Sequence, residues 1–271
     1  MLAVVPQSEL LSTAVNIGGV AMLLSTGDPD FCHVLRNRYS GFLTSNEKCE
    51  ITLDLEIVPV NFEDPDADIQ VTQKNGQWML SRGDFRAEWD SERQHCRIRQ
   101  TASPHATDSV LRIVHSLVQA TRKGFLLHAA SAIRNGNAFL FAGESGAGKS
   151  TISGLAPADV TLLTDEISYV CRGAGGYVAF GTPFTGELAK AGENVRGPVK
   201  ALYLLAKGTE NRIDPAEPGT AMRSLLSNVL FFAKDEELVR SLFDSAFEFV
   251  RHVPVYKLTF VPDARVWELI G

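Results

Sequence analysis

Residues 139–151 read Phe-Leu-Phe-Ala-Gly-Glu-Ser-Gly-Ala-Gly-Lys-Ser-Thr, and this stretch decides how the rest of the chain is interpreted. Its leading apolar residues predict a short buried strand that runs directly into the spacing Gly-x-x-x-x-Gly-Lys-Ser of a P-loop. Glycines there let successive N–H groups point at a phosphate, the lysine reaches the β- and γ-phosphates, and the serine hydroxyl binds Mg²⁺. We therefore predict a site for ATP and Mg²⁺ formed by Gly143, Glu144, Ser145, Gly146, Ala147, Gly148, Lys149, Ser150 and Thr151.

The composition argues against several classes of protein. The chain has 271 residues, of which 45% are hydrophobic, so it can bury the core of one or two domains. Its net charge of −6, with no block of basic residues, disfavours nucleic acid or an anionic membrane as the main partner. No apolar run is long enough to span a bilayer. Four scattered cysteines at no metal-binding spacing are typical of reduced thiols, so we expect a cytoplasmic protein, with self-association left open.

The first 103 residues predict a β-rich, antiparallel region with one helix over 28–38. Lys74-Asn75-Gly76 is a strong hairpin signal between two of its strands. The acidic segment 62–68 lacks the ligand spacing of a calcium loop and predicts a solvated turn. Such a region could bind a peptide or partner by adding it as an extra strand. The expected strands are 14–25 (one strand, or two short ones broken at Gly18-Gly19), 51–60, 69–73, 77–81, 85–89 and 96–101.

At Ser103-Pro104 the pattern changes, because an N-cap residue followed by proline begins an amphipathic helix. We place a domain boundary there and expect 104–271 to be an α/β P-loop kinase domain with a mixed sheet and flanking helices. The expected strands are 125–133, 137–142, 160–163, 167–170, 177–180, 199–205 and 255–260. The expected helices are 104–123, one that follows the P-loop and runs to about 154, 221–230, 236–250 and 264–270. Helix 236–250 has an apolar stripe that we expect to face the core: Leu238, Val239, Leu242, Phe243, Ala246 and Phe247.

Asp165 and Glu166 form the second informative site. They end an apolar strand sixteen residues after Lys149. A P-loop enzyme that phosphorylates a hydroxyl needs a carboxylate on the Mg²⁺ side and another that accepts the hydroxyl proton. Two adjacent acids could divide these roles in either order, whereas the alternative interpretation is a solvated turn. We favour the functional interpretation because the end of a strand is where the P-loop arrangement needs the acids.

Three further features are weaker candidates. His128 lies in the strand expected to pair with the P-loop strand, although a histidine in an apolar strand is more often a hydrogen-bonded core residue. Arg196 stands at the start of an apolar strand, where it could neutralise a transferring phosphoryl group or be a surface charge. The polar, glycine-containing segment 181–197 is typical of a substrate loop or lid.

Together these motifs resemble the catalytic domain of the HPr serine kinase/phosphorylase family. The resemblance rests on His128 in Leu-Leu-His-Ala-Ala-Ser-Ala, on 143–150, and on the strand that ends at Asp165-Glu166. Glu166 and Thr151 differ from the residues usual in that family, so the chain is most similar to its divergent members, such as lasso peptide kinases. Phosphoenolpyruvate carboxykinases resemble the pattern more distantly.

The resemblance implies ATP-dependent phosphorylation of a serine on a small protein or peptide. It implies that Asp165 is the proton-accepting base, that Ser150 and Glu166 lie on the metal side, that Lys149 clamps the phosphates, and that His128 lies beside them. Two rivals stay open at this point. One is a nucleotide-gated binding module that transfers nothing, and the other is a carboxykinase-like enzyme acting on a small molecule.

Overall fold

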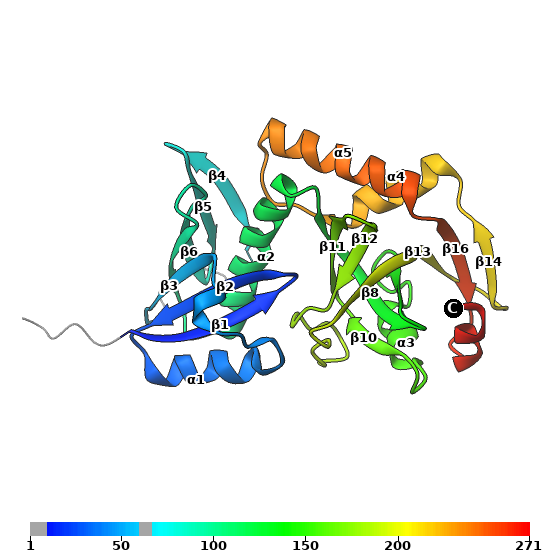
Figure 1. The fold of residues 1–271 in the computed structure, drawn as a ribbon, viewed down its shortest axis with the longest axis horizontal. Coiled ribbons are helices and arrows are strands. Elements are labelled where there is room, and N and C mark those ends of the chain that lie inside the picture. Colours follow the sequence, from blue (N-terminus) through cyan, green and yellow to red (C-terminus); the bar gives the residue numbers. More distant parts are fainter. Residues whose placement is uncertain (1–9, 60–66) are drawn as a thin grey trace, which may run out of the picture. The chain divides into compact units, whose positions relative to one another are not determined.

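The computed structural model describes residues 10–59 and 67–271, and its contacts divide the chain between Arg112 and Ile113 into two compact units (Figure 1). This division falls inside helix α2 (Pro104–Thr121), whereas the sequence predicted a boundary at the start of that helix. The predicted turn over 62–68 lies largely outside the described residues. Each unit is built around its own sheet.

The first unit holds a seven-stranded sheet with the order β1-β2-β3-β7-β6-β5-β4. Its strands are β1 (Leu11–Ile17), β2 (Val20–Thr26), β3 (Ile51–Ile57), β4 (Gln70–Lys74), β5 (Gln77–Arg82), β6 (Phe85–Asp90) and β7 (His95–Gln100). The predicted hairpin at Asn75-Gly76 is confirmed, because β4 turns into β5 there. The segment predicted as one strand or two is two: β1 turns into β2 at Gly18-Gly19, where both glycines have positive φ. Alternate residues of β3 are buried, so one face of the sheet packs into a core and the other is exposed.

The prediction that this region is antiparallel is wrong in part, because β3 runs parallel to both of its neighbours, β2 and β7. The chain between β2 and β3 contains helix α1 (Pro29–Arg38) and two short 3₁₀ helices, η1 (Ser40–Phe42) and η2 (Asn46–Lys48). Parallel neighbours need such a long crossover connection, whereas antiparallel neighbours need only a turn. The alternation of apolar residues reports which face of a strand is buried and carries no information on its direction.

The second unit holds nine strands and the remaining helices. The strands are β8 (Phe125–Arg134), β9 (Asn137–Ala142), β10 (Thr161–Thr164), β11 (Ile167–Gly173), β12 (Gly176–Phe180), β13 (Arg196–Lys207), β14 (Arg212–Pro215), β15 (Val229–Leu230) and β16 (Val255–Phe260). The helices are α3 (Lys149–Gly154), α4 (Pro218–Asn228), α5 (Glu236–His252) and the 3₁₀ helix η3 (Ala264–Leu269). The chain is thus mixed α/β, with two mixed sheets.

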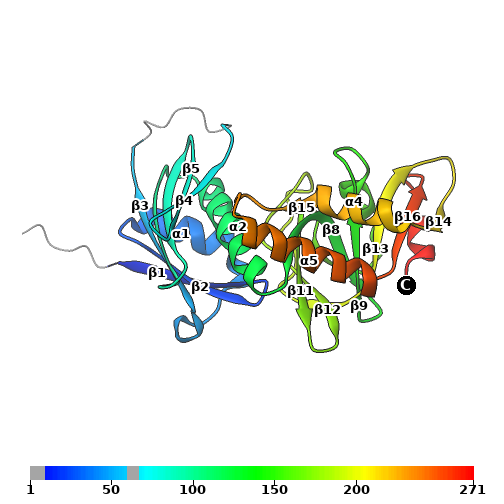
Figure 2. The same ribbon diagram turned by 90° about the horizontal axis from the view of Figure 1, so that it is seen from above.

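Strand directions in the second unit bring the predicted site residues other than Arg196 to one edge. β9 and β16 both run parallel to β13, whereas β8 runs antiparallel to β9 and to β10. The carboxyl ends of β9, β10 and β13 therefore meet at the same edge as the start of β8. Helices α4 and α5 pack on one face of this sheet (Figure 2), and α3 and η3 pack on the other. The P-loop leaves β9 at this edge.

Helix α5 presents a different face to the core from the one predicted. Val239, Phe243 and Phe247 are between 45% and 50% exposed, whereas the buried residues are Leu242, Ser245, Ala246 and Phe249. At about 100° per residue, the apolar residues of α5 cover about half of its circumference, so the periodicity allows two overlapping stripes. The core selects the stripe that includes Phe249, whose ring packs edge-on against Phe125 and Tyr177.

No helix among the described residues is both long and apolar enough to cross a bilayer. The expected terminal helix over 264–270 is the 3₁₀ helix η3, whose Trp267 indole donates a hydrogen bond to the Ile152 carbonyl at 3.1 Å. This bond ties the end of the chain to α3.

Helix α2 contains a buried histidine that makes stability depend on pH. His115 is fully buried, neither of its ring nitrogens has a hydrogen-bond partner among the described residues, and its ring packs edge-on against Tyr169 at 4.9 Å. Burial, with a smaller contribution from Arg122, lowers the pKa of His115 to about 3. Below about pH 6.5 the unfolded chain binds a proton that the folded chain does not, so stability falls as the pH falls toward 3.

We therefore expect the free energy of unfolding to drop by several kcal/mol between pH 7 and pH 3, of which about 4 kcal/mol depends on His115. Urea unfolding of the wild type and of His115→Leu at several pH values measures this contribution, because the other titrating groups are common to both proteins. The two pH profiles should diverge below about pH 6.5. Parallel profiles would show that the His115 ring is protonated, or solvated, in the native state.

Candidate functional site

The loop between β9 and α3 has the backbone conformation that its glycines allow. Gly146 and Gly148 have φ angles of +75° and +111°, which side chains rarely adopt. A Cβ on Gly148 would lie 2.7 Å from the Phe260 ring, and one on Gly143 would lie 2.7 Å from the Ala147 Cβ. Helix α3 has only six residues, so its dipole is small. An anion at this site would therefore be bound mainly by the backbone amides of the loop.

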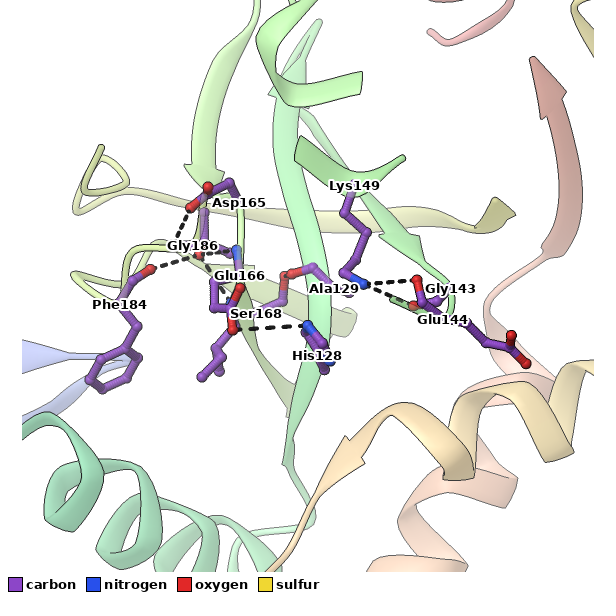
Figure 3. A network of polar contacts seen from close by, with 12 residues as sticks. His128, Ala129, Gly143, Glu144, Lys149, Asp165, Glu166, Ser168, Phe184 and Gly186 are labelled. Carbon is purple, nitrogen blue, oxygen red and sulfur yellow. Dashed lines mark hydrogen bonds and ion pairs between the residues drawn. The ribbon is translucent and has the colours of Figure 1, made fainter. Parts of the chain in front are cut away.

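Lys149 is the first residue of α3, directly after this loop, and is 8% exposed. Its Nζ donates hydrogen bonds to the carbonyl oxygens of Gly143, at 2.9 Å, and Glu144, at 3.3 Å (Figure 3). Burial lowers the pKa of Lys149, and the carboxylates of Glu166 and Glu187 oppose this shift. When a triphosphate binds, the ammonium group could replace its hydrogen bonds to these two carbonyl oxygens with bonds to phosphate oxygens.

Asp165 is 3% exposed and holds the loop that follows β12. Its Oδ1 accepts a hydrogen bond from the Gly186 amide at 2.9 Å (Figure 3). Its Oδ2 accepts one from the Leu188 amide at 3.0 Å. A Cβ on Gly186 would lie 2.6 Å from a carboxylate oxygen of Glu166 and 3.0 Å from one of Asp165, so this glycine permits the close approach. In this conformation Asp165 anchors the predicted substrate loop.

Glu166 points toward His128 instead, and Glu166 Oε1 lies 3.9 Å from His128 Nε2 (Figure 3). Both side chains are about one third exposed. The two acids face different ways because the chain turns sharply at Thr164, whose hydroxyl accepts hydrogen bonds from the amides of Glu166 and Ile167 at 3.1 and 3.2 Å. Glu166 and His128 are therefore the accessible titratable pair beside the P-loop lysine.

The arrangement of Asp165 makes a testable prediction. In Asp165→Asn one side-chain oxygen becomes an NH₂ group, which cannot accept a hydrogen bond from a backbone amide. Loss of a hydrogen bond to a charged group costs about 1.5–3 kcal/mol, so we expect the amides of Gly186 and Leu188 to exchange with solvent about 10 to 100 times faster. Hydrogen exchange measured by mass spectrometry reports this, and Glu187→Gln is the matched control in the same loop. Unchanged exchange in Asp165→Asn would show that these contacts do not hold the loop.

Arg196 does not join this group. It lies at the start of β13, where it pairs with Phe180, and its guanidinium is 5.7 Å from the centre of the Phe180 ring. The residue of β13 that pairs with the end of the P-loop strand is Leu204, eight residues further along. At the rise of a strand this separation is about 26 Å. Arg196 is thus an exposed strand residue at the opposite end from the P-loop.

The metal ligands predicted at this edge suit Mg²⁺ delivered with a nucleotide. Ser150 and Thr151 follow Lys149 in α3, Ser150 half-buried and Thr151 exposed. Among the described residues no three histidine, cysteine or acidic side chains form a metal-binding group. Mg²⁺ in phosphate-binding sites takes one or two protein ligands and completes its shell with phosphate oxygens and water. The donors present, a serine hydroxyl and a nearby carboxylate, fit that requirement.

The structure also reveals features that sequence reasoning missed. Thr164 shapes the turn between the two acids, and the hydroxyl of Ser168 donates to the Ala129 carbonyl at 2.8 Å, which joins β11 to β8 beside His128. A cavity of about 440 Å³ adjoins the first half of the P-loop. Thr164 could have been noticed from its place directly before the acids, whereas the cavity depends on the packing of α4 and has no signal in the sequence.

Comparison with known proteins corrects the predicted family. No curated protein matches the chain. The expected membership of the HPr serine kinase/phosphorylase family is wrong, because the matching family model is a different one. The three short motifs that suggested it follow from the general needs of phosphate and metal binding, so they do not distinguish one P-loop family from another. A family model described as SynChlorMet cassette protein ScmC matches residues 95–271, more than half of the chain, and the chain therefore belongs to that family.

Proposed function

We propose that this chain is an ATP-dependent phosphotransferase that moves the γ-phosphoryl group of ATP to a hydroxyl group. The observation that carries the proposal is the convergence of Lys149, held inside a glycine loop, with the carboxylate of Glu166 and the imidazole of His128 at one sheet edge. An acid beside a P-loop can hold Mg²⁺ in any such site, whereas transfer to a hydroxyl also needs a group that accepts the hydroxyl proton. Only the resemblance to the HPr serine kinase/phosphorylase family implied a serine on a peptide as the acceptor, and the chain belongs to a different family. The proposal therefore specifies the acceptor only as an alcohol.

The geometry supports a specific division of roles. Loop amides and Lys149 hold the triphosphate, and Ser150 with phosphate oxygens holds Mg²⁺, which when bound neutralises charge on the phosphates. The acceptor oxygen attacks the γ-phosphorus as the bond to the bridging oxygen of ADP breaks, and Glu166 accepts the hydroxyl proton. His128, 3.9 Å from Glu166, orients that carboxylate. This assignment gives the base role to Glu166 instead of Asp165, since both oxygens of Asp165 already accept loop amides.

A coupled assay for ADP formation tests the proposal. With Mg²⁺, ATP and a degenerate peptide library carrying a fixed central serine, the wild type should form ADP faster than with ATP alone, and chelation of Mg²⁺ should stop the reaction. Serine-bearing peptides serve here only as an available source of alcohols. ATP binding without Mg²⁺-dependent ADP formation in any of these mixtures would contradict phosphoryl transfer to a serine hydroxyl.

A nucleotide-gated binding module is a second candidate, and one observation favours it. The amides of Gly186 and Leu188 cap Asp165, so a ligand that competes for this carboxylate would release the loop. Such a module would show faster hydrogen exchange over 181–195 when ATP is added, with no ADP formed. The transferase predicts turnover in addition to any such change.

A further inference from the structure

We infer that the cavity beside the P-loop binds the nucleoside part of the nucleotide, between the loop, the end of β13 and α4. This inference rests on the proposed function and extends it by locating the ribose and base. The cavity has a volume of about 440 Å³, within the range of sites for small ligands. Residues 143–147 of the P-loop form one of its walls, so a nucleoside there would be continuous with phosphates in the loop.

The opposite walls offer the chemistry that a nucleoside requires. One contains the aliphatic side chains of Leu204 and Ala206, against which a base can lie. The other belongs to α4 and contains Ser224, Ser227 and Asn228, whose hydroxyl and amide groups can bond ribose hydroxyls or a base edge.

Two features of these residues point to a ligand. Asn228 is 9% exposed, and its amide nitrogen donates to the Ser224 carbonyl at 2.8 Å. Its side-chain oxygen has no donor among the described residues, so an acceptor remains for a ribose hydroxyl or a base N–H group. Lys207 ends β13 at the cavity and has no ion-pair partner in the described parts of the chain, so its charge is available to a phosphate oxygen.

The first test uses the unmodified protein. Isothermal titration compares Mg²⁺–ATP with Mg²⁺–methyl triphosphate, which carries the same charge and lacks the nucleoside. We expect ATP to bind at least tenfold more tightly. Equal affinities would overturn the nucleoside site while leaving the triphosphate site intact, whereas failure of both ligands to bind would overturn the proposed function itself.

The second test fills the cavity. Ser227 is exposed on α4, so Ser227→Phe can be accommodated by the fold while its ring occupies the nucleoside position. We expect this variant to bind ATP at least tenfold more weakly and methyl triphosphate within twofold of the wild type. Arg223→Phe is the matched control, because Arg223 is exposed on the same helix and does not line the cavity. Wild-type ATP affinity in Ser227→Phe, or an equal loss in Arg223→Phe, would contradict the inference.

Discussion

Replacement of Glu166 by Gln is expected to slow phosphoryl transfer by a factor of about 10² to 10⁴, the range attributed to a general base. The variant keeps the shape of the side chain and removes its ability to accept a proton. ATP affinity should stay within a few-fold of the wild type, because Lys149 and the loop amides are unchanged. Single-turnover measurements of ADP formation, combined with titration of ATP, separate the two effects.

Glu187→Gln is the control for this variant. Glu187 lies in the loop that covers Asp165, and like Glu166 its carboxylate opposes the lowering of the Lys149 pKa. The control therefore removes a comparable charge near the lysine without touching the pair formed with His128. Equal rates in the Glu166→Gln variant and the wild type would remove Glu166 from the chemistry and return the base role to Asp165.

Replacement of Lys149 by Met should weaken ATP binding by about 10- to 100-fold, because a hydrogen bond to a charged group contributes about 1.5–3 kcal/mol. Methionine has a similar length and keeps the packing of the buried part of the side chain, while it removes the bonds to the carbonyls of Gly143 and Glu144. Fluorescence titration with a labelled ATP analogue gives the two dissociation constants.

The matched control for this variant is Lys200→Met, since Lys200 is an exposed lysine in β13. It alters the net charge by the same amount at a position away from the loop. If Lys149→Met bound ATP as tightly as Lys200→Met, the loop would not be a triphosphate site and the proposal would lose its basis.

Much of the fold could be predicted from local signals. The strand before the P-loop, the turns at Gly18-Gly19 and Asn75-Gly76, and the helix that starts at Pro104 all have signatures within a few residues. It was also predictable that His128, Lys149 and Glu166 lie close together, because β8, the P-loop and β10 follow one another closely in the sequence. These features rest on turn chemistry and periodicity, which act over short stretches of chain.

Features that depend on contacts distant in sequence could not be predicted in the same way. The parallel position of β3 between β2 and β7, the exposed side of α5 and the remote position of Arg196 are each decided by packing. The capping of Asp165 depends on two loop amides more than twenty residues away, and nothing in the adjacent pair Asp165-Glu166 distinguished the anchored acid from the accessible one.

The fate of the γ-phosphoryl group itself shows whether the chain is a phosphotransferase. After incubation of the wild type with Mg²⁺, ATP labelled at the γ-phosphorus and the serine peptide library, we expect label in an acid-stable, alkali-labile ester on a peptide, and about 10² to 10⁴ times slower labelling with Glu166→Gln. Label that stays in ATP, or that appears only as inorganic phosphate, would contradict transfer to an alcohol.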